Sequence, residues 1–570
     1  MCHKILTLVC LSAVLPLPAQ SNGFADAGKA LDVVVAATSR LQPFIERYRT
    51  DRANLDRSTV RFSTERHQRF KRFESRWFDA LNQMWSDGLT VEERVDWHLF
   101  AERLRWRLAE LDHDRGRDMA CAPLLRFKEG VVLLALERRA MKETDGKKAA
   151  ERLEAIAEAA RPVEGDVDPK LAWRAAEQAG ALRRMLDAWH RFHDGYDPLL
   201  SWWTKKPYER ATRAIDAHAS WLRERGGLRG AASDAIIGEP CGEVALLSAL
   251  KREMIPYTPT ELIAIAEKEM AWCEAEMDKA SKALGFADWR EAQDHVKNLH
   301  VAPGEQPALI RDLAHEAVAF LEERELVTIP ELCKETWRME MMSPSRQKVN
   351  PYFTGGEVIS VSFPTDTMEH NDKLMSLRGN NRHFSRATVH HELIPGHHLQ
   401  MFMTSRHRTW RRPFGTPFWL EGWALYWEMR LWDLGFPQGA EDRIGMLFWR
   451  KHRCARIIFS LGFHQGTLTS GQCVDLLVSR VGHERRNAEA EVRRSVRGSY
   501  PPLYQAAYML GGLQLRALHG ELVATGKMTE RSFHDAVLHQ GSIPIEMLRA
   551  ALSNMKLPRE HETSWRFYDN

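Results

Sequence analysis

One short stretch of the chain concentrates residues that could bind a metal ion. Four histidines and one glutamate occupy the nine positions from 390 to 398: His390, His391, Glu392, His397 and His398. A zinc hydrolase needs neutral imidazole ligands and an open coordination position for water. It also needs a carboxylate that takes the proton of that water. His391 followed directly by Glu392 offers a ligand and a base, so the stretch predicts a hydrolytic metal site.

The spacing leaves the second ligand open. In the HExxH arrangement the second histidine lies four residues after the first, but here that position is Pro395. On a regular helix six residues turn by about 600°, which takes His397 off the face of His391; seven residues turn by about 700°, which returns His398 to that face about 10.5 Å along the axis. Because Pro395 and Gly396 should kink or overwind the helix, both histidines stay candidates.

A second segment offers a third ligand. Glu421 lies in a strongly apolar, aromatic run, where a carboxylate is costly unless it is paired or bound to a metal. It follows His397 by 24 residues, which suits a ligand from the next helix. Glu428, two turns further on, could orient a histidine ligand. The alternative is that both glutamates form ion pairs with Arg430 or Arg443.

These two segments together carry a family resemblance. HELIPGHH from His391 and EGWALYWE from Glu421 resemble family 885 of domains of unknown function (DUF885), which is grouped with the gluzincin-type zinc metallopeptidases. The resemblance covers most of the mature chain. It implies a mainly helical metallopeptidase-like fold and one catalytic Zn2+, with His391, His397 and Glu421 as ligands and Glu392 as base. It favours His397 over His398, because the position of His398 is less regularly histidine in the family.

The resemblance also suggests donors for the oxyanion of a tetrahedral intermediate, which such an enzyme needs. His464, Tyr504 and Tyr508 are the candidates; the alternative is ordinary core packing with a hydrogen-bonded tip. The chain departs from the family here, because Ser460–His464 keeps the histidine without the family's aspartate and Leu503–Tyr508 differs from the family's Pro-Gly-Gln-Ala pattern. These departures concern the substrate pocket rather than the metal.

The elements that position these residues are expected to be helices. Val91–Leu111 and Lys147–Ala160 have apolar residues at helical spacing. Thr258–Glu261 predicts a helix start, with threonine as N-cap, proline first and glutamate third, and Gly285 can cap its far end. The best strand signal is Glu357–Phe363. We therefore expect a mainly α fold with a small β element near the active-site helix.

The sequence gives weaker signals for how the chain divides into domains. A loop-like stretch from Gly226 to Gly238 predicts a division between an N-terminal helical region, residues 20–230, and a catalytic region, residues 231–570, although one compact unit is the alternative. The charge-rich stretch Glu484–Arg494 is predicted to be a solvated helix face.

The N-terminus predicts export. Ile5–Ala19 is uncharged and apolar after Lys4, which is typical of a secretory signal spanning residues 1–19. The protein is therefore expected in the periplasm or outside the cell. A lipid anchor at Cys10 is less favoured, because no convincing lipobox precedes it; a buried strand or a misassigned start is the alternative to a signal. No other segment approaches 18 apolar residues, so no stable membrane span is expected.

Composition narrows the classes of protein. The 570 residues are 44% apolar and 28% charged, which is ordinary for a globular chain. Lys and Arg number 80 against 77 Asp and Glu, and this balance excludes a strongly basic nucleic-acid binder. None of the eight cysteines forms a CxxC pair, which argues against structural zinc, and their wide spacing gives no disulfide pairing. Buried free thiols are expected.

Taken together, the sequence predicts an exported zinc hydrolase that cleaves a peptide or small amide substrate. The alternatives are a non-catalytic exported binding protein that keeps the fold and a zinc hydrolase of a non-peptide amide. The presence of both Glu392 and Glu421 favours the first hypothesis over a non-catalytic protein, because an inert domain has no need of a buried base.

Overall fold

The computed structural model of the chain describes residues 39–227, 236–347, 355–497 and 500–568. Across these ranges the chain is helical from α2 to α24, with one two-stranded sheet. The predicted mainly α fold with a small β element is confirmed. The predicted signal, residues 1–19, and the predicted boundary between residues 230 and 231 lie outside the described residues. No described helix combines the length and the apolarity needed to cross a bilayer.

Three helices begin the fold: α2 (Gln42–Ser58), α3 (Thr64–Gln83) and α4 (Val91–Cys121). The helix predicted from Val91 starts at that residue. Thr90 and Glu93 form a reciprocal capping box there, which satisfies backbone N–H groups of the first turn.

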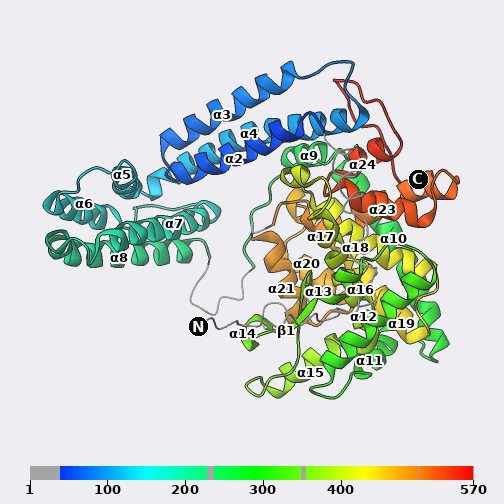
Figure 1. Cartoon of the computed structure of the whole chain (residues 1–570). Coiled ribbons are helices and arrows are strands. Elements are labelled where there is room, and N and C mark those ends of the chain that lie inside the picture. The colour runs from blue at the N-terminus through cyan, green and yellow to red at the C-terminus, as the bar shows by residue number, and fades with distance from the viewer. Residues whose placement is uncertain (1–38, 228–235, 348–354, 498–499, 569–570) are drawn as a thin grey trace, which may run out of the picture.

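The next four helices form a lobe with its own hydrophobic core, on the left of Figure 1. They are α5 (Lys128–Arg139), α6 (Gly146–Ala159), α7 (Pro169–His193) and α8 (Pro198–Arg225). The helix predicted over Lys147–Ala160 is α6. Leu153, Leu186 and Leu222 are fully buried in this core.

The larger core joins the two ends of the chain. Ile45 and Phe100 of the first helices share it with Trp423 and Met547 from the C-terminal half. Because α2, α3 and the start of α4 pack on the C-terminal half, the lobe of α5 to α8 is the part with a separate core. The division into residues 20–230 and 231–570 stays a prediction.

The segment after the lobe leads into the site. Its helices are α9 (Glu243–Arg252), α10 (Pro259–Ala283), α11 (Trp289–Asn298), α12 (Gln306–Glu323), α13 (Glu331–Thr336), α14 (Pro344–Gln347) and α15 (His370–Gly379). As predicted, α10 begins with a capping box between Thr258 and Glu261 and with Pro259 in its first turn. Gly285 follows its end with φ of 85°, the left-handed conformation that favours glycine.

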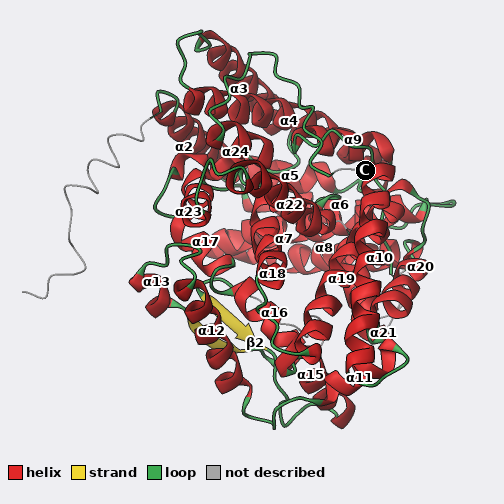
Figure 2. Cartoon of the chain, turned by 90° about the vertical axis from the view of Figure 1, so that its right-hand side faces the viewer, coloured by secondary structure: helices red, strands yellow, loops and turns green. Residues whose placement is uncertain are grey.

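The small sheet supports the helix that carries the metal motif. β1 (Arg338–Met341) pairs in parallel with β2 (Val358–Val361). Ile359 and Val361 are fully buried and belong to a small core with Leu313 of α12 and with Val389 and Leu393. Figure 2 shows the strands beside α12 and α16. The predicted strand thus has a structural role behind the site.

The site itself is built by α16 (Arg382–Glu392), α17 (His397–Thr404), α18 (Pro417–Asp433), α19 (Ala440–Gln465) and α22 (Tyr504–His519). The remaining elements are α20 (Ser470–Leu476), α21 (Arg485–Val496), α23 (Glu530–Gln540), α24 (Ile545–Leu552) and the short turns η1 (Ala122–Leu124), η2 (Thr409–Phe414), η3 (Leu477–Val481) and η4 (Gly520–Ala524).

The prediction of a solvated face over Glu484–Arg494 is wrong for one side of α21. Ala488 and Val492 are fully buried, and Glu491 is 7% exposed. Glu491 accepts a hydrogen bond from Arg456 of α19 at 2.8 Å, so an internal ion pair explains this carboxylate. The six cysteines of the described chain are free thiols, and five of them are buried, as expected.

The closest approach of two helices in the site is made by glycines. An added Cβ on Gly422 of α18 would lie 2.6 Å from backbone atoms of Gly511 in α22. A Cβ on Gly511 would lie 2.0 Å from the carbonyl oxygen of Phe418. The two backbones therefore touch, and this contact fixes the distance between the side chains of α18 and those of α22.

Replacing Gly511 with alanine should force α22 away from α18, because the new methyl group meets rigid backbone. We expect Gly511→Ala to lower the free energy of unfolding by about 1–3 kcal/mol or more, measured by chemical denaturation. Gly520→Ala is the matched control: its added Cβ meets nothing within 4 Å and its φ is −57°. Equal effects of the two substitutions would contradict the contact.

Candidate metal centre

A break between α16 and α17 brings two histidines together. The α16 helix ends at Glu392, and Leu393 leaves helical conformation with φ of −108° and ψ of −104°. The N–H of Gly396 then donates to the carbonyl of His390 at 3.0 Å. A Cβ on Gly396 would lie 1.8 Å from the carbonyl oxygen of His391, so only glycine fits this turn.

The turn decides between the two candidate histidines. The rings of His391 and His397 lie 4.9 Å apart at 89° to each other. His398 lies elsewhere, with Nε2 2.8 Å from the carbonyl oxygen of Cys333. The structure therefore brings His397, and not His398, to His391.

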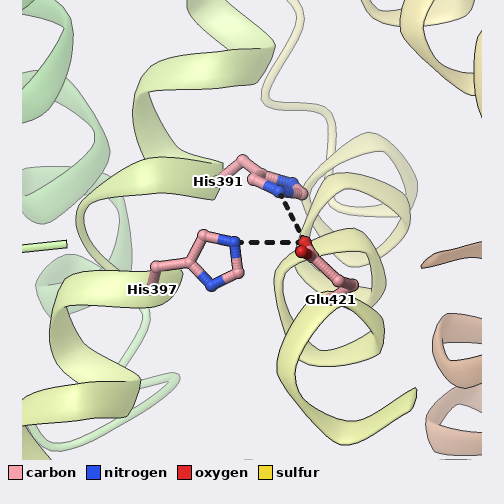
Figure 3. A group of neighbouring side chains, drawn as sticks. All are labelled: His391, His397 and Glu421. Atoms are coloured by element: carbon pink, nitrogen blue, oxygen red, sulfur yellow. Dashed lines mark ion pairs between the residues drawn. The ribbon is translucent and has the colours of Figure 1, made fainter. Parts of the chain in front are cut away.

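The third predicted ligand faces both rings (Figure 3). Oε2 of Glu421 lies 3.3 Å from Nε2 of His397 and 3.7 Å from Nε2 of His391. The three possible ligand atoms all lie within 4.8 Å of one another. Ligand atoms bound tetrahedrally at 2.0–2.1 Å are about 3.3–3.4 Å apart. The chemistry of this donor set therefore fits a zinc ion. The distance from Glu421 to His397 matches the tetrahedral value, and the distance from Glu421 to His391 is slightly longer.

Hydrogen bonds on the far side of each ring aim the two Nε2 atoms at Glu421. Nδ1 of His391 donates to Oε1 of Glu428 at 2.6 Å. Nδ1 of His397 lies 3.3 Å from Oε1 of Gln400. The amide nitrogen of Gln400 donates to the carbonyl oxygens of Trp419 and Leu420, each at 3.1 Å, so its oxygen is the atom left for His397. Such partners fix the tautomer and the orientation of a metal-binding histidine.

The geometry thus supports the suggested role of Glu428 in orienting a histidine. The cationic partner of Glu428 is Arg453, whose Nη2 lies 3.4 Å from Oε1 of Glu428. Of the alternative partners weighed from the sequence, Arg430 pairs with Glu530 and Arg443 stacks on Trp432.

The electrostatics of the cluster are those of two histidines around one carboxylate. Burial raises the pKa of Glu421, but hydrogen bonds from His391 and His397 hold that pKa well below its ordinary value. Burial lowers the pKa of His397, and Glu421 more than offsets this and raises the pKa to about 9. Oε2 of Glu421 nevertheless receives no well-aligned hydrogen bond from the described residues. A cation between the three atoms would satisfy it.

Glu392 lies next to the cluster without being part of it. It is the last residue of α16 and is half-buried. Its carbonyl accepts from the N–H of Gly356 at 3.2 Å, and a Cβ on Gly355 would lie 2.7 Å from its Oε2. Its charge contributes to the raised pKa of His397. The Glu392 carboxylate is therefore close enough to interact electrostatically with His397, but it is not one of the three candidate metal ligands.

Two tyrosines of α22 line the same place. Tyr504 donates from its hydroxyl to Oε1 of Glu421 at 2.5 Å. The ring of Tyr508 lies nearly parallel to that of His391, 6.2 Å away. The guanidinium groups of Arg453 and Arg456 lie 4.6 and 4.4 Å from the centre of the Tyr508 ring. Burial first, and then the charge of Glu421, raises the pKa of Tyr508, so its hydroxyl keeps its proton.

His464 is not brought to the cluster. It lies in the last turn of α19, where its carbonyl accepts from the N–H of Gly242 and its ring contacts Phe463. Among the described residues no hydrogen bond or ring contact joins it to His391, His397 or Glu421. Its suggested part in catalysis has no support in this geometry.

Sequence reasoning missed two positioning residues. Gln400 lies three residues after His397 on one helix, and this spacing was a usable signal. Arg453 comes from α19, which no sequence pattern linked to Glu428.

A large cavity lies elsewhere. It has a volume of about 1740 Å³ between α3, α4 and α7 on one side and α15 and α21 on the other. The three candidate ligands do not line it, since their side chains are only 2–9% exposed. A series of contacts through α21 connects this cavity to the cluster. Arg494 lines the cavity and forms an ion pair with Glu491. Glu491 also pairs with Arg456, whose guanidinium lies over the Tyr508 ring.

Comparison with known proteins gives a family and a fold. The model of a family named "Bacterial protein of unknown function (DUF885)" matches residues 47–552. No curated protein matches the chain. Two solved structures, each described as a putative lipoprotein, are similar. The one from Shewanella oneidensis, of unknown function, has a TM-score of 0.69 at 18% identity and covers 90% of this chain and 100% of its own.

The other structure, from Colwellia psychrerythraea, has a TM-score of 0.57 at 15% identity and covers 87% of this chain and 92% of its own. At these identities the likeness establishes the helical fold alone.

The ligand set can be tested by metal content. We expect the purified protein to hold about one zinc ion per chain, and His397→Ala or Glu421→Ala to lose most of it. His398→Ala is the matched control, because its ring is already bonded to the carbonyl of Cys333. Elemental analysis after dialysis measures the ratio. Zinc kept by His397→Ala and lost by His398→Ala would refute this ligand set.

Metal binding should also be pH-dependent. With a pKa of about 9, His397 is protonated in the metal-free protein at neutral pH and must lose its proton to bind zinc. Zinc affinity should therefore fall as the pH is lowered from about 9 towards neutrality. At neutral pH about one proton should be released per zinc ion, which calorimetry in buffers of different ionisation heats detects. Binding without proton release would show that both rings are already neutral.

Proposed function

The chain belongs to the DUF885 family of bacterial proteins of unknown function, and we propose from its site that it is a zinc-dependent hydrolase that cleaves peptide or other amide bonds. The observation that carries the proposal is the convergence of His391, His397 and Glu421, with Glu392 beside them. The family name gives no activity, so the argument rests on what these side chains can do.

The donor set is typical of catalytic rather than structural zinc. Structural sites use four protein ligands, often cysteines, whereas catalytic sites use three ligands and leave one position for water or substrate. Two imidazoles and one carboxylate are a known catalytic combination. When bound, zinc would polarise the substrate carbonyl and lower the pKa of a water molecule. The proposed kinship with the gluzincin-type metallopeptidases rests on this order of ligands, two histidines followed by a glutamate on a later helix.

The protein's own residues would divide the remaining work. Glu392 would take a proton from the attacking water and pass it to the nitrogen of the leaving amine. Tyr508, which keeps its hydroxyl proton and lies beside His391, would donate to the oxyanion. Tyr504 would hold Glu421 in place through Oε1, which leaves Oε2 for the metal. Glu428 and Gln400 would keep both rings aimed.

Export is part of the proposal. The apolar stretch from Ile5 to Ala19 has the character of a secretory signal. The two similar solved structures are each described as a "putative lipoprotein", and lipoproteins are a class of exported protein, so this description supports export for the present chain as well.

The decisive variant is Glu392→Gln, which keeps the shape of the side chain and removes the proton acceptor. Loss of a general base typically costs 10²–10⁴-fold in rate, while the three ligands are untouched. We expect this variant to be folded, loaded with zinc and nearly inactive on a mixed peptide library read by mass spectrometry. Glu560→Gln, at an exposed site far along the chain, is the matched control and should keep full activity.

Full activity of Glu392→Gln would refute the hydrolase mechanism. If the unsubstituted protein bound zinc but cleaved no peptide, the next assay would test it against a library of small non-peptide amides. Cleavage there would identify a hydrolase of non-peptide amides, and no cleavage would favour the binding protein.

A further inference from the structure

The α5–α6 and α7–α8 connections lie at the end of the lobe farthest from the other helices, at the far left of Figure 1, and exposed apolar side chains cluster in and beside them. Seven large apolar side chains of the described chain are at least 60% exposed, and five of them lie here. We call this group the lobe tip: Met141 (90% exposed), Phe192 (60%), Tyr196 (86%), Leu199 (67%) and Trp202 (72%). Clustered exposure of this kind marks an interaction site, whereas single exposed apolar residues do not.

Contacts between the helices bring these segments to one place. Arg138, at the end of α5, donates to the carbonyl of Ala188 in α7 at 2.7 Å, and its guanidinium lies 5.0 Å from the centre of the Phe192 ring. Gly146, at the start of α6, packs against the first turn of α8, since an added Cβ would lie 3.0 Å from the Trp203 ring. The α5–α6 and α7–α8 connections therefore meet at the same end of the lobe.

The α7–α8 connection holds its side chains outward by a defined turn. Gly195 has a φ of 81°, which glycine adopts readily, and its N–H donates to the hydroxyl of Ser201. The N–H of Tyr196 donates to the carbonyl of His193 at 3.1 Å. Asp197 then caps α8 by accepting from the N–H of Leu200 at 2.9 Å. The conformation of this turn therefore directs the side chain of Tyr196 into solvent.

The surroundings of the lobe tip are cationic. Residues 137–148 and 188–206 together contain eight Lys and Arg against five Asp and Glu. The exposed cations of these ranges are Arg139, Lys142, Lys147, Lys148, Arg191, Lys205 and Lys206, and the exposed carboxylates are Glu143, Asp145, Asp194 and Asp197. The border therefore carries both signs with a positive excess. The local excess of three positive charges equals the net charge of the whole 570-residue chain, which is +3.

Aromatic side chains with a cationic border match the chemistry of one kind of partner. Trp and Tyr have apolar rings with a polar tip and are enriched at the level of lipid headgroups. Lys and Arg near them are attracted to anionic headgroups. Two copies of the chain meeting at this patch would bring together two borders of the same net charge, whereas an anionic surface complements the positive excess.

We propose that the lobe tip binds the surface of a bilayer that contains anionic lipid. Tyr196, Leu199 and Trp202 enter the headgroup layer, and the lysines and arginines around them pair with lipid phosphates. The contact is peripheral and reversible, and it is independent of the metal centre and of the proposed hydrolase activity.

Co-sedimentation with vesicles tests the proposal. The full chain should bind vesicles of phosphatidylcholine and phosphatidylglycerol at 7:3 more tightly than vesicles of phosphatidylcholine alone, and added salt should weaken the binding. The triple variant Tyr196→Ser, Leu199→Ser, Trp202→Ser should bind the mixed vesicles at least about tenfold more weakly. Its thermal unfolding should be unchanged, because these side chains are 67–86% exposed.

The matched control removes three exposed apolar side chains elsewhere: Met119→Ser, Val244→Ser and Leu332→Ser, from positions 53–84% exposed. It should bind vesicles like the unsubstituted chain. Equal binding by both triple variants would overturn the proposal and assign any membrane affinity to another part of the chain. A dimer of the unsubstituted chain in sedimentation equilibrium that the lobe-tip variant loses would also overturn it, by making the tip a contact between copies.

Discussion

The site depends on one buried carboxylate placed between two imidazoles. Glu421 is 5% exposed and faces Nε2 of both His391 and His397. Burying such a charge is costly unless opposite charge and hydrogen bonds compensate. In the metal-free protein a protonated His397 supplies that charge, and in the proposed holoprotein a zinc ion would replace the proton.

Keeping those atoms together is mainly the work of backbone contacts that only glycine permits. Gly396 lets the chain turn between α16 and α17, so that two histidines six residues apart meet on one side. Gly422 and Gly511 let α18 and α22 touch, so that Tyr504 reaches Glu421. In addition, each histidine ring has its own hydrogen-bond acceptor: Glu428 for His391 and Gln400 for His397. The backbone, and not only the side chains, therefore determines the arrangement.

The candidate metal centre and the lobe tip lie in different parts of the molecule. The candidate metal centre lies in the large core, where burial strengthens electrostatic interactions. The lobe tip is carried by helices with a separate core, and there apolar side chains stay exposed. The large cavity lies between α3, α4 and α7 on one side and α15 and α21 on the other.

The sequence by itself determined the mainly helical fold and the capped start of α10, and it identified His391, Glu392 and Glu421 as candidates, because these depend on local patterns and residue chemistry. Only the tertiary structure showed that His397, and not His398, lies beside His391. The positions of these rings depend on how the chain turns at Gly396, and the angle between two residues on a regular helix does not apply across a break. Long-range packing likewise placed Arg453 by Glu428 and kept His464 away from the cluster. Such contacts join segments distant in the chain, and local periodicity holds no information about them.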